Sequence, residues 1–403
     1  MFENIVNQSV TSLLKNDIQK NNLPGAILFN GNSGSGKLST ALELARVLSC
    51  KGQKKGDWLC TCSNCLSNKA LVNQNVIIAG SRDCSPEILA SKETFINALY
   101  ENAPYIEATR YLFIRSIRKL TSRFNQILWQ GDSNISKIAS VIGEIDEELE
   151  NIDFPHKIPP LEETKKCTEN LVKLCSKLES DFLYDSIPIN NIRNVSSWAR
   201  LKVQEGKKTI IIENADKMLE NVRNALLKIL EEPPEDTVFI LTTSKKSAVM
   251  PTILSRVRIY NFSERSLESQ KQVITRVFHN KNFNGTINDF LLNFLPVKFN
   301  DLEQKAKDFY SDISSFKIPE IQKIIKDCNN FEPRIMLKIF IQAIVKEQKA
   351  FLSSAQGTYK AFETLKELKN CYSNITTYNQ SVQAAFENLV KELSKINKIY
   401  GTK

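Results

Sequence analysis

Residues 28–40 read LFNGNSGSGKLST, and this stretch decides which fold the chain is expected to have. It contains most of the phosphate-binding pattern G-x-x-x-x-G-K-[ST], through Gly31, Gly34, Gly36 and Lys37. An apolar run at 26–29 precedes it and an apolar helical pattern at 40–48 follows it, which is the strand–loop–helix context such a loop needs. Backbone N–H groups of the loop would hold phosphate at the start of the helix, and Lys37 would reach the terminal phosphates. A glycine-rich turn with a chance lysine is the alternative, and the near-complete spacing disfavours it.

The residue after the loop lysine departs from the pattern. A Ser or Thr at this position gives its hydroxyl to the Mg²⁺ of a bound nucleotide, but the chain has Leu38, which cannot bind a cation. Ser39 carries a hydroxyl, yet successive side chains on a helix point about 100° apart. We keep Ser39 among the candidate nucleotide-binding residues and predict a degenerate loop that binds ATP and Mg²⁺ poorly, if at all.

A second candidate feature is the acidic end of a buried strand. The run Ile210–Ile212 is followed by Glu213 and Asn214. ATPases with such loops use a carboxylate here to hold Mg²⁺. Glu213 is therefore a candidate, whereas Asn214 cannot accept a proton as a base. A strand that simply ends in a polar turn is the alternative, and for catalysis it is the stronger interpretation.

Four of the nine cysteines are crowded into a short span, at Cys50, Cys60, Cys62 and Cys65. Four thiolates are enough for a closed tetrahedral Zn²⁺ site, and the chain has only two histidines to offer instead. A redox pair or inert thiols are the alternatives. We favour structural zinc, because crowded cysteines in a chain without a secretory signal are more often metal ligands than disulfides.

Length and composition bound the remaining possibilities. A chain of 403 residues is expected to form two or three domains, and 42% hydrophobic with 25% charged residues is typical of globular proteins. No apolar run is long enough for a membrane span, and the start MFENIVNQSV lacks a signal-peptide pattern, so we expect a cytoplasmic protein. The net charge of +9 permits nucleic-acid contact without requiring it.

Further apolar runs predict strands that alternate with helices, and this alternation predicts a parallel sheet with helices on both faces. The strands are expected at 76–79, 209–212, 238–242 and 257–260, and helices at 4–20, 192–203 and 219–230. A segment at about 85–183 has helical periodicity without any chemical motif. Only helical patterns follow residue 263.

Several motifs together resemble the bacterial DNA polymerase III clamp-loader subunits, which are AAA+ proteins. The most specific is NALLKILEEPP at 224–234, which is very similar to the family's N-A-L-L-K-x-L-E-E-P-P. Residues 2–8 resemble its N-terminal box, 242–244 its sensor-1 segment, and 255–257 its S-R-C motif with Val257 replacing the cysteine. The resemblance covers about 1–80 and 185–262 well.

The resemblance implies an α/β AAA+ fold, related to phosphate-loop NTPases, followed by all-α lid and all-α collar domains. It implies an AAA+ domain at 1–262, a lid at 263–315 and a collar at 316–403. A zinc module at about 50–65 lies within the first domain, and about 85–183 resembles a lineage-specific helical insertion of unknown role.

The departures at Leu38, Glu213 and Asn214, and the lack of a clear Gly-x-x-Arg sensor-2 pattern between 285 and 310, imply the delta-prime type. Such a subunit is catalytically weak or silent. Its Arg256 would act in trans as an arginine finger on a neighbouring ATPase, and Thr243 would correspond to the sensor-1 residue. The implied partners are the gamma/tau and delta subunits, the sliding clamp and primer–template DNA, with no membrane.

Three alternatives stay open at this point. The chain could be an ATP-hydrolysing gamma/tau-type subunit that tolerates Leu38 and uses Glu213 for the metal. It could be a zinc-stabilised scaffold without a role in replication, which the motif at 224–234 disfavours. Arg256 alone could be a surface arginine in a local salt bridge.

Overall fold

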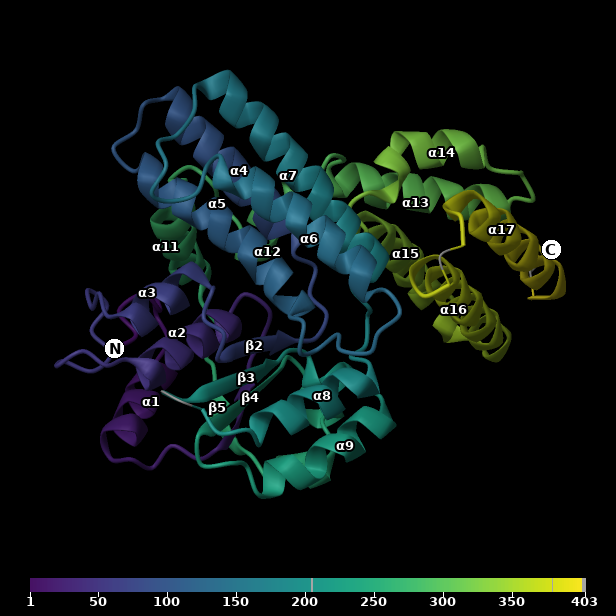
Figure 1. The fold of residues 1–403 in the computed structure, drawn as a ribbon. Coiled ribbons are helices and arrows are strands. Elements are labelled where there is room, and N and C mark those ends of the chain that lie inside the picture. Colours follow the sequence, from purple (N-terminus) through teal and green to yellow (C-terminus); the bar gives the residue numbers. More distant parts are fainter. Residues whose placement is uncertain (204–205, 379, 401–403) are drawn as a thin grey trace. The chain divides into compact units, whose positions relative to one another are not determined.

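The structure is a computed structural model that describes residues 1–203, 206–378 and 380–400 (Figure 1). The chain forms two compact units. The first comprises Met1–Cys175 and Tyr184–Phe290, and the second comprises Ser176–Leu183 and Leu291–Lys403. The division into 1–262, 263–315 and 316–403 stays a prediction, and residues 401–403 of its last part lie outside the described residues.

The centre of the first unit is a five-stranded, all-parallel sheet in the order β2-β3-β4-β1-β5. Its strands are β1 (Ala26–Asn30), β2 (Val76–Ala79), β3 (Lys208–Ile212), β4 (Thr237–Thr243) and β5 (Arg258–Asn261). Every residue of β3 and β4 is buried. A strand covered on both faces needs apolar side chains at successive positions, which is why these strands read as continuous apolar runs.

One face of the sheet packs against α1 (Val10–Gln19) and α2 (Lys37–Ser49). Leu14 of α1 and Leu44 of α2 are fully buried in this core together with Phe29 and Ile240 from the sheet. The α/β class predicted from the sequence is therefore confirmed for this unit.

The segment between β2 and β3 is helical, as its periodicity predicts. It contains α4 (Ser85–Tyr100), α5 (Ile106–Thr121), the short 3₁₀ helix η1 (Ser122–Phe124), α6 (Ile135–Glu150), α7 (Leu161–Phe182) and α8 (Ile189–Ala199). The remaining helices of the sheet-containing region are α3 (Ser63–Ala70), α9 (Glu220–Glu231), α10 (Pro251–Leu254) and α11 (Leu267–Phe278). In Figure 1, α8 and α9 lie side by side, and the two helices are in contact.

The regular secondary structure of the second unit consists of helices in the part of the chain that the structure describes. After α12 (Ile287–Leu292), which contributes to both units, it contains α13 (Phe299–Ser314), α14 (Ile321–Asp327), α15 (Ile335–Glu347), α16 (Ala355–Thr376) and α17 (Val382–Tyr400). A group of phenylalanine rings forms its core, at Phe309, Phe331, Phe340 and Phe386. Helical structure after residue 263 is thus confirmed.

Two helix boundaries predicted from the sequence are wrong. The first helix begins at Val10 rather than near residue 4, because Asn7 has a positive φ, which a right-handed helix cannot accommodate. The helix expected at 192–203 is α8, which starts at Ile189 and ends at Ala199. Among the described residues, we find no helix with the length and apolar character that a bilayer crossing requires.

Candidate nucleotide and metal sites

The predicted nucleotide-binding residues come together at the carboxyl-terminal edge of the sheet. The phosphate loop follows β1, Glu213 follows β3, and Thr243 ends the intervening strand β4. Asn30 pairs in register with Thr243, and the Gly31 N–H donates to the Thr243 carbonyl over 3.2 Å. Crevices at this edge of open α/β sheets are where ligands bind.

The loop turns through two glycines before helix α2 begins. Gly34 and Gly36 have φ values of 75° and 92°, in the left-handed region that favours glycine, and α2 starts at Lys37. The Lys37 ammonium folds back and donates to the carbonyls of Gly31 and Asn32, over 2.5 and 2.8 Å. Burial lowers the pKa of Lys37 to about 8, against the opposing effect of Glu213. Lys37 is therefore held beside the loop.

Leu38 and its neighbour Ser39 lie in different environments on helix α2. Leu38 is 4% exposed and belongs to the apolar core between α2 and the sheet. Ser39 is exposed and faces away from that core. The side chain that follows the loop lysine is thus a packing residue rather than a cation ligand.

The carboxylate of Glu213 is bound by two arginines. Arg123, in η1, donates to Glu213 Oε2, and Arg82 Nη1 lies 3.5 Å from Glu213 Oε1. The side chains of Glu213 and Arg123 are 8% and 1% exposed. Sequence analysis missed both arginines, because they come from segments without any motif.

Further charged residues surround Arg82 on the side away from the sheet. Glu87 of α4 pairs with Arg82 over 3.1 Å and with Lys119 of α5. Burial on its own would raise the pKa of Glu87, but the cations of Lys119 and Arg82 outweigh burial and hold it at about 2. The helical segment thus supplies both cations and an anion to the acidic edge of the sheet.

The other polar groups near the loop also have partners within the chain. Thr243 donates to Asp216 over 2.6 Å and accepts from the Lys245 N–H over 3.0 Å. Asn214, with φ 54°, donates from its amide to the Ser81 carbonyl over 2.6 Å. The predicted roles of Ser39, Glu213 and Thr243 in nucleotide binding stay predictions.

Arg265 is a further residue at the loop that the sequence did not reveal. Its guanidinium donates to the carbonyl of Gly34, and to the carbonyl of Val6 over 2.8 Å. A Cβ placed on Gly36 would lie 3.1 Å from Arg265 Nη2. Burial lowers the pKa of Arg265. Arg265 therefore adds a second cation beside Lys37.

Arg256 lies at the opposite edge of the sheet from the loop. It precedes β5, whose first residue Arg258 pairs with Ile27, near the amino end of β1. Arg256 is 28% exposed and its Nη2 lies 3.2 Å from Glu231 Oε2. This is the local salt bridge that sequence analysis left open, and it lies at the end of the strands opposite the loop.

The four clustered cysteines converge on one point. Their sulfur atoms all lie within 4.8 Å of one another, and those of Cys50 and Cys60 are 3.8 Å apart. Sulfurs bound to one Zn²⁺ at about 2.3 Å in a tetrahedron are roughly 3.8 Å apart, so the donor set fits zinc. Burial opposes ionisation of Cys62, but N–H groups of Lys51 and Cys65 outweigh it and lower its pKa to about 6.

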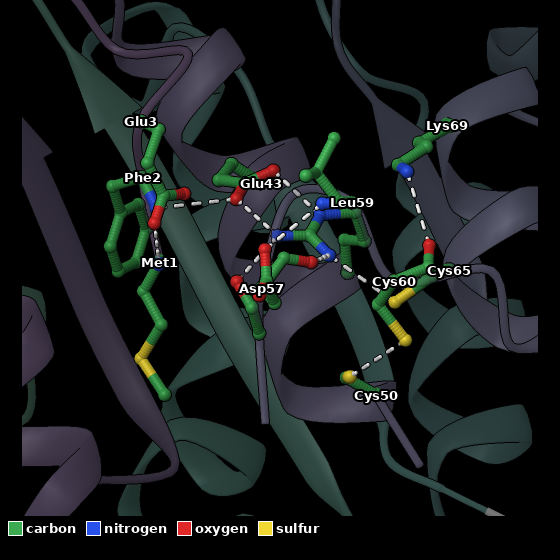
Figure 2. Close-up of polar contacts among 12 residues, drawn as sticks. Met1, Phe2, Glu3, Glu43, Cys50, Asp57, Leu59, Cys60, Cys65 and Lys69 are labelled. Atoms are coloured by element: carbon green, nitrogen blue, oxygen red, sulfur yellow. Dashed lines mark hydrogen bonds and ion pairs between the residues drawn. The ribbon is translucent and has the colours of Figure 1, made fainter. Parts of the chain in front are cut away.

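Arg46, a buried residue of α2, links this cluster to the N-terminus. All five N–H donors of its guanidinium are used, on Glu43, Gly56, Asp57 and Cys65. Its Nη1 lies 3.2 Å from the sulfur of Cys65. Figure 2 shows Glu43 on one side of these contacts and the cysteines on the other, and the Phe2 N–H also donates to Glu43. Cys50 and Lys37 stand at opposite ends of the 13-residue α2, so the cluster is about 20 Å from the loop.

Comparison with known proteins gives consistent results. The family model described as "DNA polymerase III, delta subunit" matches residues 6–142 and 147–266. The delta' subunit of DNA polymerase III from Buchnera aphidicola (subsp. Baizongia pistaciae) is 27% identical over 170 residues, which are 40% of this chain and 50% of that protein. The delta' subunit from Haemophilus influenzae is 33% identical over 78 residues, 19% of this chain and 24% of that one.

Other matches are to gamma-type proteins. The gamma/tau subunit from Mycobacterium bovis is 36% identical over 75 residues, 19% of this chain and 13% of that one. A solved structure of a gamma-subunit-related protein from Thermotoga maritima covers 57% of this chain and 90% of that one, with 15% identity and a TM-score of 0.27. The matches span between about a quarter and a half of the lengths of the delta' relatives. The family model matches more than half of the residues of this chain. The chain therefore belongs to the DNA polymerase III delta-subunit family, as a delta-prime-type clamp-loader subunit.

Proposed function

We propose that this chain assists ATP-driven loading of the sliding clamp onto primed DNA without hydrolysing ATP itself, and supplies Arg256 to the ATP site of a neighbouring subunit. Its partners are the gamma/tau and delta subunits, the clamp and primer–template DNA. The proposed lack of ATP hydrolysis rests on the pairing of Glu213 with Arg123 and Arg82. A carboxylate that two cations already neutralise is a poor magnesium ligand. The other expected ligand, a Ser or Thr hydroxyl after the loop lysine, is replaced by the apolar side chain of Leu38.

The placement of Arg256 supports a role in trans. Because it lies at the edge of the sheet opposite the phosphate loop, the phosphates it contacts must belong to another chain. Its exposed pair with Glu231 is worth about 0.2–1 kcal/mol. An arginine finger contributes about 10³–10⁵ in rate, which corresponds to roughly 4–7 kcal/mol in the transition state. The local salt bridge is therefore weak enough to be exchanged for a phosphate.

The metal part of the proposal is that Cys50, Cys60, Cys62 and Cys65 hold a structural Zn²⁺. A closed four-thiolate set leaves no open position for substrate, and it lies far from the loop at the other end of α2. The metal would then stabilise the segment between α2 and α3.

The proposal is tested by mixing the chain with gamma/tau and delta subunits and measuring ring assembly and ATP turnover. Arg256→Ala should lower turnover of the assembled complex by at least about 10³-fold while assembly is retained. Glu231→Gln, which frees Arg256 from its local partner, serves as the matched control and should leave turnover intact. Unchanged turnover with Arg256→Ala would contradict the finger, and brisk hydrolysis by the isolated chain would contradict its silence.

A further inference from the structure

The N-terminal segment, residues 1–8, begins beside the chain that carries the clustered cysteines (Figure 2). The Phe2 N–H donates to the carboxylate of Glu43 over 3.3 Å. Met1 lies against Gly56, because a Cβ placed on this glycine would come within 2.7 Å of Met1 Cγ. The start of the segment therefore contacts the residues that surround the cysteine sulfurs.

The other end of the N-terminal segment is bonded to α11 and to the residues that precede this helix. Gln8 donates to the Ser263 carbonyl over 2.9 Å and accepts from the Ser263 N–H over 3.1 Å. Arg276 of α11 donates to the Glu3 carbonyl over 3.2 Å. The segment is thus a physical connection between the cysteine cluster and α11, and all of it lies in the first unit.

The buried pair of Glu43 and Arg46 joins the N-terminal segment to the cysteines. The two side chains are 1% and 2% exposed. Glu43 accepts from Arg46 over 2.6 and 2.9 Å and also from the Phe2 N–H. Arg46 in turn donates to the sulfur of Cys65 over 3.2 Å. A buried ion pair is stable only while its remaining hydrogen bonds are made, so a change beside Cys65 alters the pair that holds Phe2.

Phe2 has a backbone conformation that depends on these contacts. Its φ is 67°, in the left-handed region that residues other than glycine rarely adopt. Such strain persists only where the surroundings over-determine the conformation. Two contacts hold Phe2, since its ring is buried in the core beside α1 and α2 and its N–H is bonded to Glu43. Loss of the second contact would let the backbone relax and would displace the segment.

We propose that metal occupancy of the cysteine cluster controls the order of residues 1–8 and, through them, of helix α11, and that the Glu43–Arg46 pair transmits the change. The chain between the cysteines supplies three of the five hydrogen bonds of Arg46. Metal-stabilised segments loosen when the metal leaves, and Arg46 would then keep only its bonds to Glu43. The inference rests on the zinc part of the proposed function, since the cysteines must hold a metal.

Helix α5 also contacts the cysteine segment and provides an internal control. Arg115 and Tyr111 of α5 both donate to the carbonyl of Lys69, near the end of α3. Unlike the N-terminal segment, α5 has a fully buried apolar face of its own, at Phe113, Ile117 and Leu120. We therefore expect α5 to stay protected when the metal is removed, because its burial does not depend on the cysteines.

The test is hydrogen exchange of the full chain, first with one bound zinc ion and then after removal of the metal with EDTA. The reporters are the N–H groups of Ile5, which donates to the Phe2 carbonyl over 3.0 Å, of Ser263, and of α11. We expect these groups to exchange at least about tenfold faster without metal, as loss of one or two hydrogen bonds would produce. Helix α5 and strand β4 should keep their protection.

Two outcomes overturn the inference. One is unchanged exchange at the reporters after the metal has been removed. The other is an equal rise in exchange across the whole first unit, β4 included, because the metal would then support the unit in general rather than the N-terminal segment. The comparison uses the unaltered chain, so it does not depend on whether a variant folds.

A matched pair of variants tests the transmitting residue. Glu43→Gln removes the charge that Arg46 and the Phe2 N–H share. With zinc bound, its reporters should exchange as fast as those of the metal-free chain, and coupling is reciprocal, so zinc retention against a chelator should fall about tenfold. Glu3→Gln is the control, because its side chain is 56% exposed and its carbonyl makes the contact to α11. A folded Glu43→Gln chain with unchanged exchange and unchanged zinc retention would overturn the inference.

Metal analysis separates this test from the zinc proposal. A purified chain without bound metal would overturn both. A chain that holds one zinc ion, and whose reporters do not respond to its removal, would overturn this inference alone. The Arg256 test is independent of either result, because it measures turnover at a neighbour's site in the assembled complex.

Discussion

The guanidinium of Arg123 binds the carboxylate of Glu213, which lies 90 positions later in the sequence. One partner sits in η1 of the helical segment, and the other ends strand β3 of the sheet. The helical segment between β2 and β3 therefore contributes to the candidate site. Its arginine occupies the carboxylate that a hydrolysing relative would need for its metal.

Removing Arg123 should destabilise the first unit. Arg123→Ala leaves the buried Glu213 with only the longer contact to Arg82, so we expect a loss of about 3 kcal/mol in the free energy of unfolding. Urea denaturation measures this loss. Arg82→Ala is the matched control and should cost less, because Arg82 is 33% exposed. Equal, near-zero losses for both variants would show that the pairing contributes nothing to folding.

Placing a hydroxyl at position 38 should not give the isolated chain ATPase activity. Leu38→Thr cuts an apolar side chain out of the core and should lower the free energy of unfolding by about 2–5 kcal/mol. ATP turnover by the isolated chain should stay at background, because Glu213 remains paired. Ser39→Ala, at an exposed position, should leave both stability and turnover unchanged. Measurable hydrolysis by Leu38→Thr would mean that the arginines do not silence the site.

The cysteine cluster should carry about one zinc ion per chain, measured by metal analysis of the purified protein. A double Cys60→Ser and Cys62→Ser variant should lose that metal. Arg46→Lys should weaken zinc retention against a chelator by about 10–100-fold, because lysine cannot contact Cys65 and Glu43 together. Lys69→Met, which removes a contact to the Cys60 carbonyl and one to the Trp58 ring but none to a sulfur atom, is the milder control. Full retention by Arg46→Lys would show that Arg46 does not position the cluster.

Phosphate binding should weaken as the pH rises through the pKa of Lys37. Burial lowers this pKa to about 8, Glu213 and Asp216 oppose the shift, and Arg82 adds to it. Below pH 8 the ammonium is charged and ready to bind. Above it, binding must first take up a proton, so affinity should fall about tenfold per pH unit. Titrations between pH 7 and 9.5 measure this slope, and Lys37→Met should flatten it.

The parts of the fold that depend on residues close together in the sequence could be predicted. Strand β2 was predicted with its observed bounds, because a buried parallel strand is a continuous apolar run. The cysteine cluster was recognisable since its members lie close in the sequence. Helix α1 was predicted too long, because nothing in the apolar pattern shows that Asn7 takes a positive φ.

The residues that set the character of the site could not be predicted. Arg123 and Arg265 reach their partners across long stretches of chain, and no local pattern marks an arginine for such a contact. Arg46 did leave a signal, as a charged residue inside the apolar pattern of α2, where an isolated cation would be costly. One partner, Glu43, lies a turn earlier on the same helix, but the others come from the segment after α2, whose path the sequence does not reveal.

The use of every donor on Arg46 has a consequence for how this chain can change in evolution. Removal of the segment that bears Gly56, Asp57 and the cysteines would take away three of the five hydrogen bonds of the buried guanidinium and leave only the two to Glu43. A lineage that dispenses with the metal must therefore replace the arginine in the same step, or keep the loop after its thiols are gone.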